Sequence, residues 1–232
     1  MRKITSLFFL IIFSLGTFSG FLLTVMATWA DMEAASYGLP RTGGERLTTL
    51  YCPILMTKSE IGTFSVKVVN TTDKKIASSI RTDIATQFDP VSSIVPVQLA
   101  PGETKRIEEK IGPENLILGQ FIFARASVNA YPLPERENSC GVFVVDLPTN
   151  GSMITWTMVG LSLLGMSVGL YGMTRSKTFM NSQRMDIRLL ILVASLVIVG
   201  ILSSFLGWWM LGLLATIVFV LTLLMSFYTA RK

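Results

Sequence analysis

Cys52 and Cys140 are the residues of this chain best suited to covalent chemistry. They are the only two cysteines among 232 residues, and the chain contains no histidine. Two cysteines without histidine provide neither the four ligands of a structural zinc site nor a Cys-His nucleophile pair. The chemistry left to them is one disulfide bond in an oxidising compartment. A pair of buried free thiols, expected in a reducing compartment, is the alternative.

Other catalytic groups are equally scarce. The lack of histidine removes the usual general base and the commonest metal ligand. A Ser-Lys dyad is formally possible, but no Ser and Lys pair stands in a recognisable context, and no glycine-rich phosphate loop follows a strand pattern. We therefore expect a non-enzymatic protein with no catalytic residue, no cofactor and no metal site.

The elements that carry the two cysteines lie between apolar blocks. Half of the chain is hydrophobic, and residues 4–30, 153–173 and 189–228 contain no Asp, Glu, Lys or Arg. About 20 apolar residues cross a bilayer as a helix, so the last block is long enough to cross twice. The blocks predict four transmembrane helices, at residues 1–30, 152–174, 189–206 and 209–229.

The charges predict which parts of the chain face the cytoplasm. The N-terminus, the 175–188 loop and the C-terminus together hold eight basic residues and one acid, whereas residues 31–150 hold 12 basic and 14 acidic residues. Lys and Arg are enriched in cytoplasmic segments. We therefore expect both termini and the 175–188 loop in the cytoplasm of a plasma-membrane protein, with residues 31–150 extracytoplasmic. The net charge of +5 then reflects sidedness, and no nucleic-acid partner is expected.

Aromatic residues agree with this topology, because Trp and Tyr collect at membrane interfaces. All four tryptophans fall at predicted outer ends of helices and are expected to be interface anchors: Trp29, Trp156, Trp208 and Trp209. Tyr171 and Tyr228 fall at inner ends. Residues 203–210 must form a tight turn between the last two helices.

The first helix begins after Arg2 and Lys3, as in a signal sequence. Its apolar run exceeds the usual 7–15 residues of a signal peptide, so we expect an uncleaved signal anchor, with cleavage after Ala27 as the alternative. Residues 31–46 are rich in glycine, proline and small residues, which is typical of a linker.

Residues 47–147 have the period of two that predicts β-strands. Phe64, Val66 and Val68 alternate with polar residues, and residues 79–84, 95–99, 118–130 and 140–147 give further strands. Residues 104–111 alternate poorly and predict an edge strand. Pro101-Gly102 suits the centre of a type II turn. About seven strands in this length predict an antiparallel β-sandwich.

Three stretches of this segment resemble the immunoglobulin-like modules of bacterial and archaeal cell-surface proteins. They are Tyr51-Cys52-Pro53, residues 62–73 with the Asn70-Thr71-Thr72-Asp73 turn, and Leu99-Ala100-Pro101-Gly102-Glu103-Thr104. The resemblance covers residues 47–147 and implies an adhesion, scaffold or accessory domain without catalytic residues. The tryptophan of an antibody-type core is absent.

Both cysteines are in phase with apolar neighbours and can face the core of such a sandwich. A disulfide that closes this loop would stabilise the domain by about 4–5 kcal/mol in the chain-entropy model. Asn70-Thr71-Thr72 also matches an N-glycosylation acceptor, but we favour a hairpin turn.

Small residues predict packing faces on two helices. Gly16 and Gly20 are spaced as GxxxG in the first helix. In the second, Ser162, Gly165, Gly169 and Gly172 share one face, which lets helix backbones approach closely in lipid. Glycines that take no part in packing are the alternative.

The expected function is binding or scaffolding of another envelope or membrane protein by the extracytoplasmic domain. The alternative is an accessory subunit of a transporter or other membrane complex, with contacts made mainly by the helices. A transporter acting alone is disfavoured, because the apolar blocks that form the four spans carry no charged residue. The lipid bilayer is the other expected partner.

Overall fold

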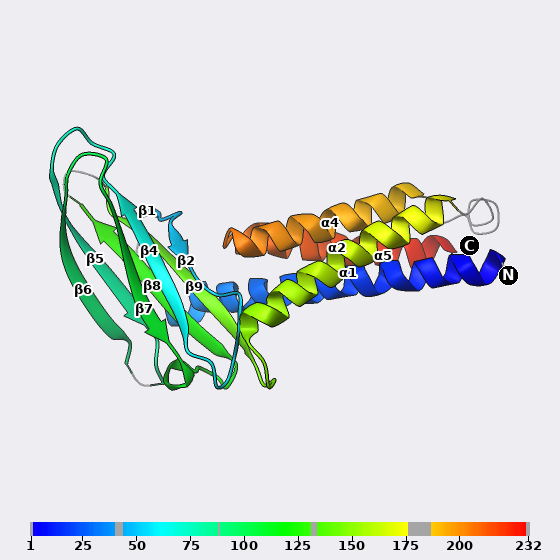
Figure 1. The fold of residues 1–232 in the computed structure, drawn as a ribbon, viewed down its shortest axis with the longest axis horizontal. Helices are drawn as coiled ribbons and strands as arrows, with labels where there is room; N and C mark the ends of the chain where they lie inside the picture. Colours follow the sequence, from blue (N-terminus) through cyan, green and yellow to red (C-terminus); the bar gives the residue numbers. More distant parts are fainter. Residues whose placement is uncertain (1, 40–43, 88, 131–133, 176–186, 231–232) are drawn as a thin grey trace. The chain divides into compact units, whose positions relative to one another are not determined.

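The computed structural model describes residues 2–39, 44–87, 89–130, 134–175 and 187–230. The chain divides into a β unit, Trp29–Ser152, and a helical unit made of the residues up to Thr28 and from Met153 onward. Figure 1 shows the order of the elements along the chain.

The helical unit contains the four helices that the apolar blocks predict, each long and apolar enough to cross a membrane. Most of the 175–188 loop lies outside the described residues. The helices are α1 (Arg2–Glu33), α2 (Gly151–Arg175), α4 (Ile187–Phe205) and α5 (Trp209–Ala230).

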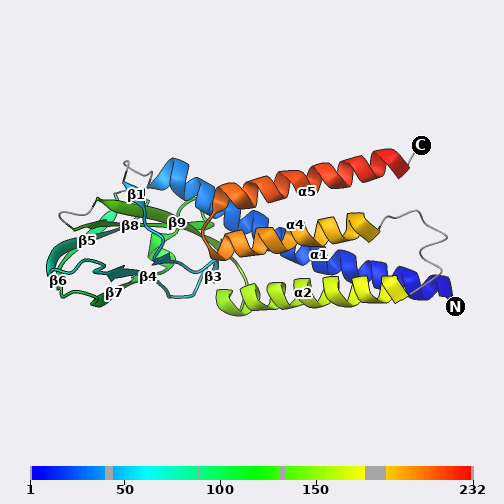
Figure 2. The same ribbon diagram turned by 90° about the horizontal axis from the view of Figure 1, so that it is seen from above.

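Helix α1 contacts each of the other three helices, which run beside it in Figure 2. Its Gly16 lies against the backbone of α2, and its Gly20 lies against Val197 of α4. The ring of Phe21 stacks on Phe219 of α5 with 4.6 Å between centroids. Within this unit α1 is therefore the shared packing element.

The turn between α4 and α5 falls inside the predicted segment 203–210. Helix α4 ends at Phe205 and α5 begins at Trp209. Gly207 has φ +60°, a left-handed conformation that glycine adopts without steric cost. The backbone N–H of Trp208 donates to the carbonyl of Ser203 at 2.9 Å.

Within the described residues the β unit has nine strands in two sheets. One sheet has the order β1-β9-β8-β5-β6, with β3 also paired to β9, and the other has the order β2-β4-β7. The strands are β1 (Glu45–Arg46), β2 (Leu50–Tyr51), β3 (Leu55–Thr57), β4 (Gly62–Val69), β5 (Ile76–Ile84), β6 (Val91–Leu99), β7 (Thr104–Ile111), β8 (Phe121–Asn129) and β9 (Arg136–Val145).

The sequence predicted about seven strands, all antiparallel. The extra strands are two or three residues long, too short to show a period of two. Two of them, β1 and β3, pair parallel to β9, so this sheet is mixed. Strand β7 ends the three-stranded sheet, as its poor alternation predicted.

The two sheets enclose a common core. Val66 and Val68 of β4 share a buried cluster with Ile80 of β5 and Ala126 of β8. Phe64 shares a second cluster with residues of β8 and β9. The alternation seen along the sequence therefore places one face of each long strand inside.

The opposite face of the six-stranded sheet is covered in part by the end of α1. After Glu33 the chain forms a π turn, η1 (Ala34–Gly38). Ala30 and Ala34 pack against Phe121 and Phe123 of β8. This part of the expected 31–46 linker is helical, because its small alanines permit close contact with a flat aromatic surface.

Candidate functional site

The two cysteines form a disulfide bond, which confirms the prediction. Cys52 follows β2, Cys140 lies in β9, and their Cα atoms are 6.5 Å apart across a separation of 88 residues. Cys140 belongs to the buried core cluster that contains Phe64, and Cys52 packs against this cluster. The bond therefore links the three-stranded sheet to the six-stranded sheet.

Asn70 connects the two turns on which the family resemblance rests. Its side chain is fully buried, and Nδ2 donates to the carbonyls of Lys74 at 2.8 Å and Leu99 at 3.0 Å. The backbone carbonyl of Asn70 accepts the backbone N–H of Gly102, whose φ of +74° fits the predicted type II turn. Because the amide already has two partners and no exposure, Asn70 is a structural turn residue. The expected hairpin is wrong, however, because β4 pairs with β2 and β7 whereas β5 pairs with β6 and β8, so this turn connects the two sheets.

Asp83 is a buried carboxylate at the centre of a polar cluster on the outer face of the six-stranded sheet. Only 1% of its side chain is exposed. Oδ2 accepts hydrogen bonds from Arg125 Nε at 3.0 Å and Nη2 at 2.8 Å. Oδ1 accepts from Arg81 Nε at 2.9 Å and from Ser92 Oγ at 2.5 Å. The cluster thereby joins β5, β6 and β8.

The electrostatics of this cluster follow from its contacts. Burial of Asp83 favours the neutral acid and would raise its pKa. Hydrogen bonds from Ser92, Arg125 and Arg81 stabilise the carboxylate and prevail, so the pKa lies below the ordinary 3.8. The partners of the Asp83 carboxylate are side chains of β5, β6 and β8, so its hydrogen bonds hold these three strands together.

The end of α1 is fixed to β9 at Gly141. A Cβ at this position would collide with the carbonyl of Ala30, so only glycine permits the approach. The Asp31 carboxylate accepts the backbone N–H of Gly141 at 2.9 Å. That N–H lies on the edge of β9 between the stretches paired with β1 and β3. Asp31 therefore closes a gap in the sheet edge.

Trp29 belongs to the β unit. The residue is 40% exposed, and its ring lies edge-on to that of Phe121 with 5.3 Å between centroids. Its Nε1 donates to Glu33 at 3.0 Å. The residue expected as an interface anchor therefore also packs on β8.

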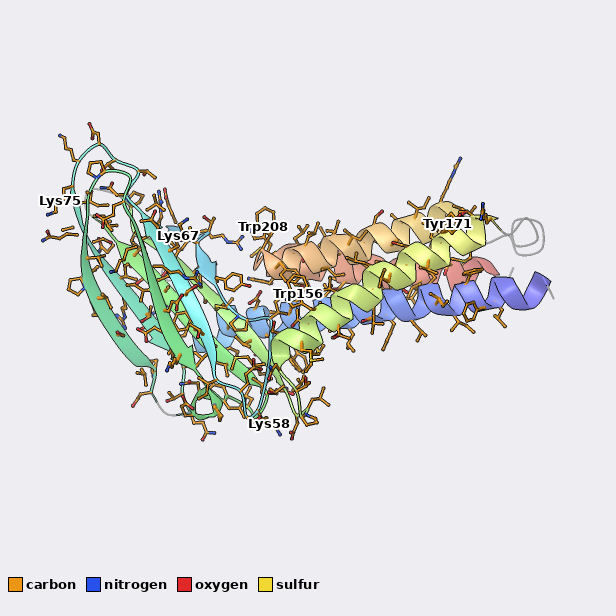
Figure 3. The ribbon with its side chains drawn as sticks, in the orientation of Figure 1. Lys58, Lys67, Lys75, Trp156, Tyr171 and Trp208 are labelled. Carbon is orange, nitrogen blue, oxygen red and sulfur yellow. A yellow bond between two sulfur atoms is a disulfide. The ribbon has the colours of Figure 1, made fainter. Side chains whose placement is uncertain are left out.

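The other expected anchors lie in the helical unit. Trp156 is 63% exposed, with its ring 5.6 Å from that of Phe205. Trp208 is 45% exposed, and Trp209 begins α5 half-buried. Figure 3 shows Trp156 and Trp208 toward one end of the helical unit and Tyr171 toward the other. Aromatic side chains thus lie near both ends of the apolar helices.

The glycines expected to pack do lie between helices. A Cβ on Gly165 would come 2.8 Å from the Cα of Gly16. Gly169 and Gly172 lie against Phe13 and Phe9 of α1 in the same way. Ser162 is fully buried beside Gly20. A Cβ on Gly160, by contrast, would meet nothing within 4 Å, so this glycine is not at an interface.

The outer face of the three-stranded sheet carries an exposed cationic surface. Lys67 of β4 lies opposite Arg106 of β7. Two residues along β4, Ser65 lies between Glu108 of β7 and Tyr51 of β2, which is 63% exposed. Lys110 continues the row. Arg106 pairs with Glu108 at 2.9 Å. Lys67 and Lys110 have no ion-pair partner among the described residues. We call Tyr51, Lys67, Arg106, Glu108 and Lys110 the basic face.

Figure 3 labels Lys67 on this sheet and Lys75 farther along the β unit. No linear motif in the sequence indicates the basic face, because its members come from three strands. The one indication in the sequence is the high charge of residues 104–111, which form β7 and include five charged side chains among eight residues.

Comparisons with known proteins add no family. No protein-family model matches the chain, and no curated protein matches it. A putative β-galactosidase from Bacteroides fragilis is 18% identical at a TM-score of 0.33, over 40% of this chain and 16% of that one. A superoxide reductase from Ignicoccus hospitalis is 12% identical at a TM-score of 0.33, over 49% of this chain and 91% of that one. Likenesses this weak carry no argument about fold or activity.

Proposed function

We propose that this chain is a non-enzymatic integral membrane protein whose immunoglobulin-like outer domain binds another envelope or membrane protein. In this proposal the four helices cross the plasma membrane with both termini in the cytoplasm. Residues 31–150 then face outward. The concentration of basic residues outside that segment supports this orientation.

The observation that carries the binding role is the basic face. Residues 31–150 hold two more acids than bases, yet this one face presents three cations against a single carboxylate. An exposed tyrosine and an exposed arginine on the same face are typical of protein interfaces, in which both residue types are enriched. Two unpaired lysines add a positive potential that steers association with a negative surface. The partner is therefore a protein with an acidic patch.

The buried polar contacts and the disulfide of the β unit support the same role. The buried polar groups Asp83 and Asn70 are each surrounded by structural partners. The disulfide and the Asp31 contact hold the sheet edges near the end of α1. A rigid sheet of this kind presents a surface with little loss of conformational freedom on binding.

Photo-crosslinking in native membranes tests the proposal. A photoreactive phenylalanine at position 51 should give one specific protein adduct, whereas the same residue at Leu118, which is 64% exposed, should not. The double change Lys67→Glu and Lys110→Glu should lower the adduct yield by about tenfold, since like charges across an interface cost several kcal/mol.

A matched control changes the net charge equally but elsewhere. Lys74→Glu with Lys75→Glu reverses two exposed lysines at the turn before β5 and should leave the yield unchanged. Equal losses in the two double variants would show that only net charge matters, and the basic face would not be the site.

A further inference from the structure

Strand β6 is an open edge of the six-stranded sheet. It is the last strand in the order β1-β9-β8-β5-β6. Its nine residues, Val91–Leu99, contain no charged side chain. Val91 is 58% exposed and Ile94 is 64% exposed. Long, uncharged, apolar edges are rare in soluble domains because they template pairing with another strand.

Each of the other edges in the described residues is charged, paired or short. Strand β7 has five charged residues among its eight, a common protection against pairing. The outer edge of β9 is paired with β1 and β3 and capped by Asp31 at Gly141. Strand β2 has only two residues. Strand β6 has only Pro96 as a device of this kind, so it is the least protected long edge among the described strands.

Pro96 indicates which backbone groups of β6 are open. Proline has no N–H, so in a paired strand its nitrogen must face away from the neighbour, here β5. Alternation in an antiparallel ladder then places the N–H and C=O groups of Ser92, Ile94 and Gln98 on the same outward side. Within the described residues these groups have no backbone hydrogen-bond partner. With the carbonyl of Pro96, which faces the same way, the edge offers three N–H donors and four C=O acceptors.

Pro96 also discriminates between two occupants. In a symmetric antiparallel pairing of β6 with β6 of a second copy, both prolines enter the new ladder and two donors are missing. A strand from a different protein meets one proline and loses one donor. The edge therefore favours a different protein over a second copy.

The side chains indicate the sequence that would fit. Val95 and Val97 point toward the core but stay half-buried at the rim. Every second side chain of an added strand would lie on the same face as Val95 and Val97 and would cover them. Its remaining side chains would lie beside Ile94 on the outer face. The complementary segment is extended and apolar at alternate positions, as in strand-addition recognition.

We propose that β6 accepts an extended segment of another protein as an additional antiparallel or parallel strand of the six-stranded sheet. This second site lies on a different sheet from the basic face and does not depend on it. Main-chain hydrogen bonds hold the segment, and Val95 and Val97 select apolar residues.

The test removes outward donors without touching the bonds to β5. The full-length protein in native membranes carries a photoreactive phenylalanine at position 91. Ile94→Pro and Gln98→Pro each delete one open N–H, whereas Ile94→Ala and Gln98→Ala keep it and remove the side chain. We expect each proline variant to lower the adduct yield at least fivefold relative to its alanine control. Pro96→Val adds a donor and should raise the yield.

Folding is checked by formation of the Cys52–Cys140 bond and by resistance to protease, and a variant that fails is replaced by the proline at the other position. Equal yields for proline and alanine variants would overturn the proposal. So would the lack of any adduct at position 91, or an adduct with the mass of two copies of this chain. Loss of the position 51 adduct alone would bear only on the basic face.

Discussion

Several buried or half-buried polar side chains in the β unit bond to residues far away in the sequence, whereas several in the helical unit bond within their own helix. Asp83 reaches Arg125 across 42 residues, and Asp31 reaches Gly141 across 110. In the helical unit Thr17 donates to the carbonyl of Phe13, and Thr24 donates to that of Gly20. Ser19, which donates to Met158 of α2, is an exception.

The difference is the one expected if, as proposed, the β unit lies in water and the helices lie in lipid. A domain in water gains specificity from polar links between distant segments, because alternative arrangements leave those groups unpaired. Helices in lipid have little hydrophobic drive to associate and depend on close backbone packing. Gly16 against Gly165 is that kind of contact. We therefore expect the stability of the β unit to depend mainly on the links between its distant segments. The stability of the helical unit should depend mainly on the size of the side chains between its helices.

The largest expected effect is loss of the disulfide. Cys52→Ser should destabilise the β unit by about 4–5 kcal/mol in the chain-entropy model, Cys140→Ser should do the same, and the double variant should be no worse. Hydrogen exchange of the β8 amides in the full-length protein measures the free energy of opening. A double variant that is clearly worse than either single one would mean that the thiols also stabilise separately.

Core truncation should come next. Phe64 is 1% exposed, so Phe64→Ala should cost about 3–5 kcal/mol. Lys67→Ala, three residues along on the outer face of the same strand, should change stability by less than about 0.5 kcal/mol. The same exchange measurement compares the two variants. Similar costs would contradict the assignment of the two faces of β4.

The Asp83 cluster tests the polar cross-links directly. Asp83→Asn leaves Arg125 without its carboxylate, and we expect a cost of about 2–4 kcal/mol, below that of a fully buried pair because Arg81 is half exposed. Since the folded pKa of Asp83 is lowered, its contribution is fully present above the unfolded pKa. It is lost as the pH falls through the folded pKa.

Stability measured against pH provides the check on sign. Between pH 7 and the ordinary carboxyl pKa, the difference between wild type and Asp83→Asn should stay constant, and it should shrink at lower pH. A difference that grows on acidification would mean that burial, and not the arginines, dominates the carboxyl.

The smallest expected effect concerns helix packing. Gly165→Leu should destabilise the helical unit by about 1–3 kcal/mol, the usual cost of overpacking, because its Cβ would come 2.8 Å from the Cα of Gly16. Gly160→Leu on the same helix is the control, since a Cβ there meets nothing within 4 Å. Thermal unfolding in detergent compares the two. Since leucine favours a helix more than glycine does, Gly160→Leu should not lower stability, and equal losses in the two variants would show that the contact with Gly16 is not the cause.

The sequence predicted the elements that have a long periodic pattern. The four helices follow from uninterrupted apolar blocks, and the disulfide follows from two cysteines in phase with core residues. The turn at Gly102 follows from Pro-Gly chemistry. In each case local residues alone determine the outcome.

Contacts between distant short segments were beyond prediction. Strands β1 and β3 are too short to show a period, and their parallel partner β9 is about 90 residues away. Ala30 and Ala34 resemble linker residues until Phe121 and Phe123 provide the surface on which they pack. The basic face likewise needs the pairing of β4 with β7 before its cations are seen to adjoin.

The central claim is that the outer domain, and not the helices, holds the partner. The direct measurement replaces residues 1–28 with an unrelated apolar helix and ends the chain after Ser152. It thus keeps Trp29–Ser152 with the α1 segment that packs on β8. With the photoreactive residue at position 51, we expect an adduct of the same partner at half the original yield or more. Loss of the adduct from a chimaera that has formed its disulfide would contradict the claim and favour an accessory subunit bound through its helices.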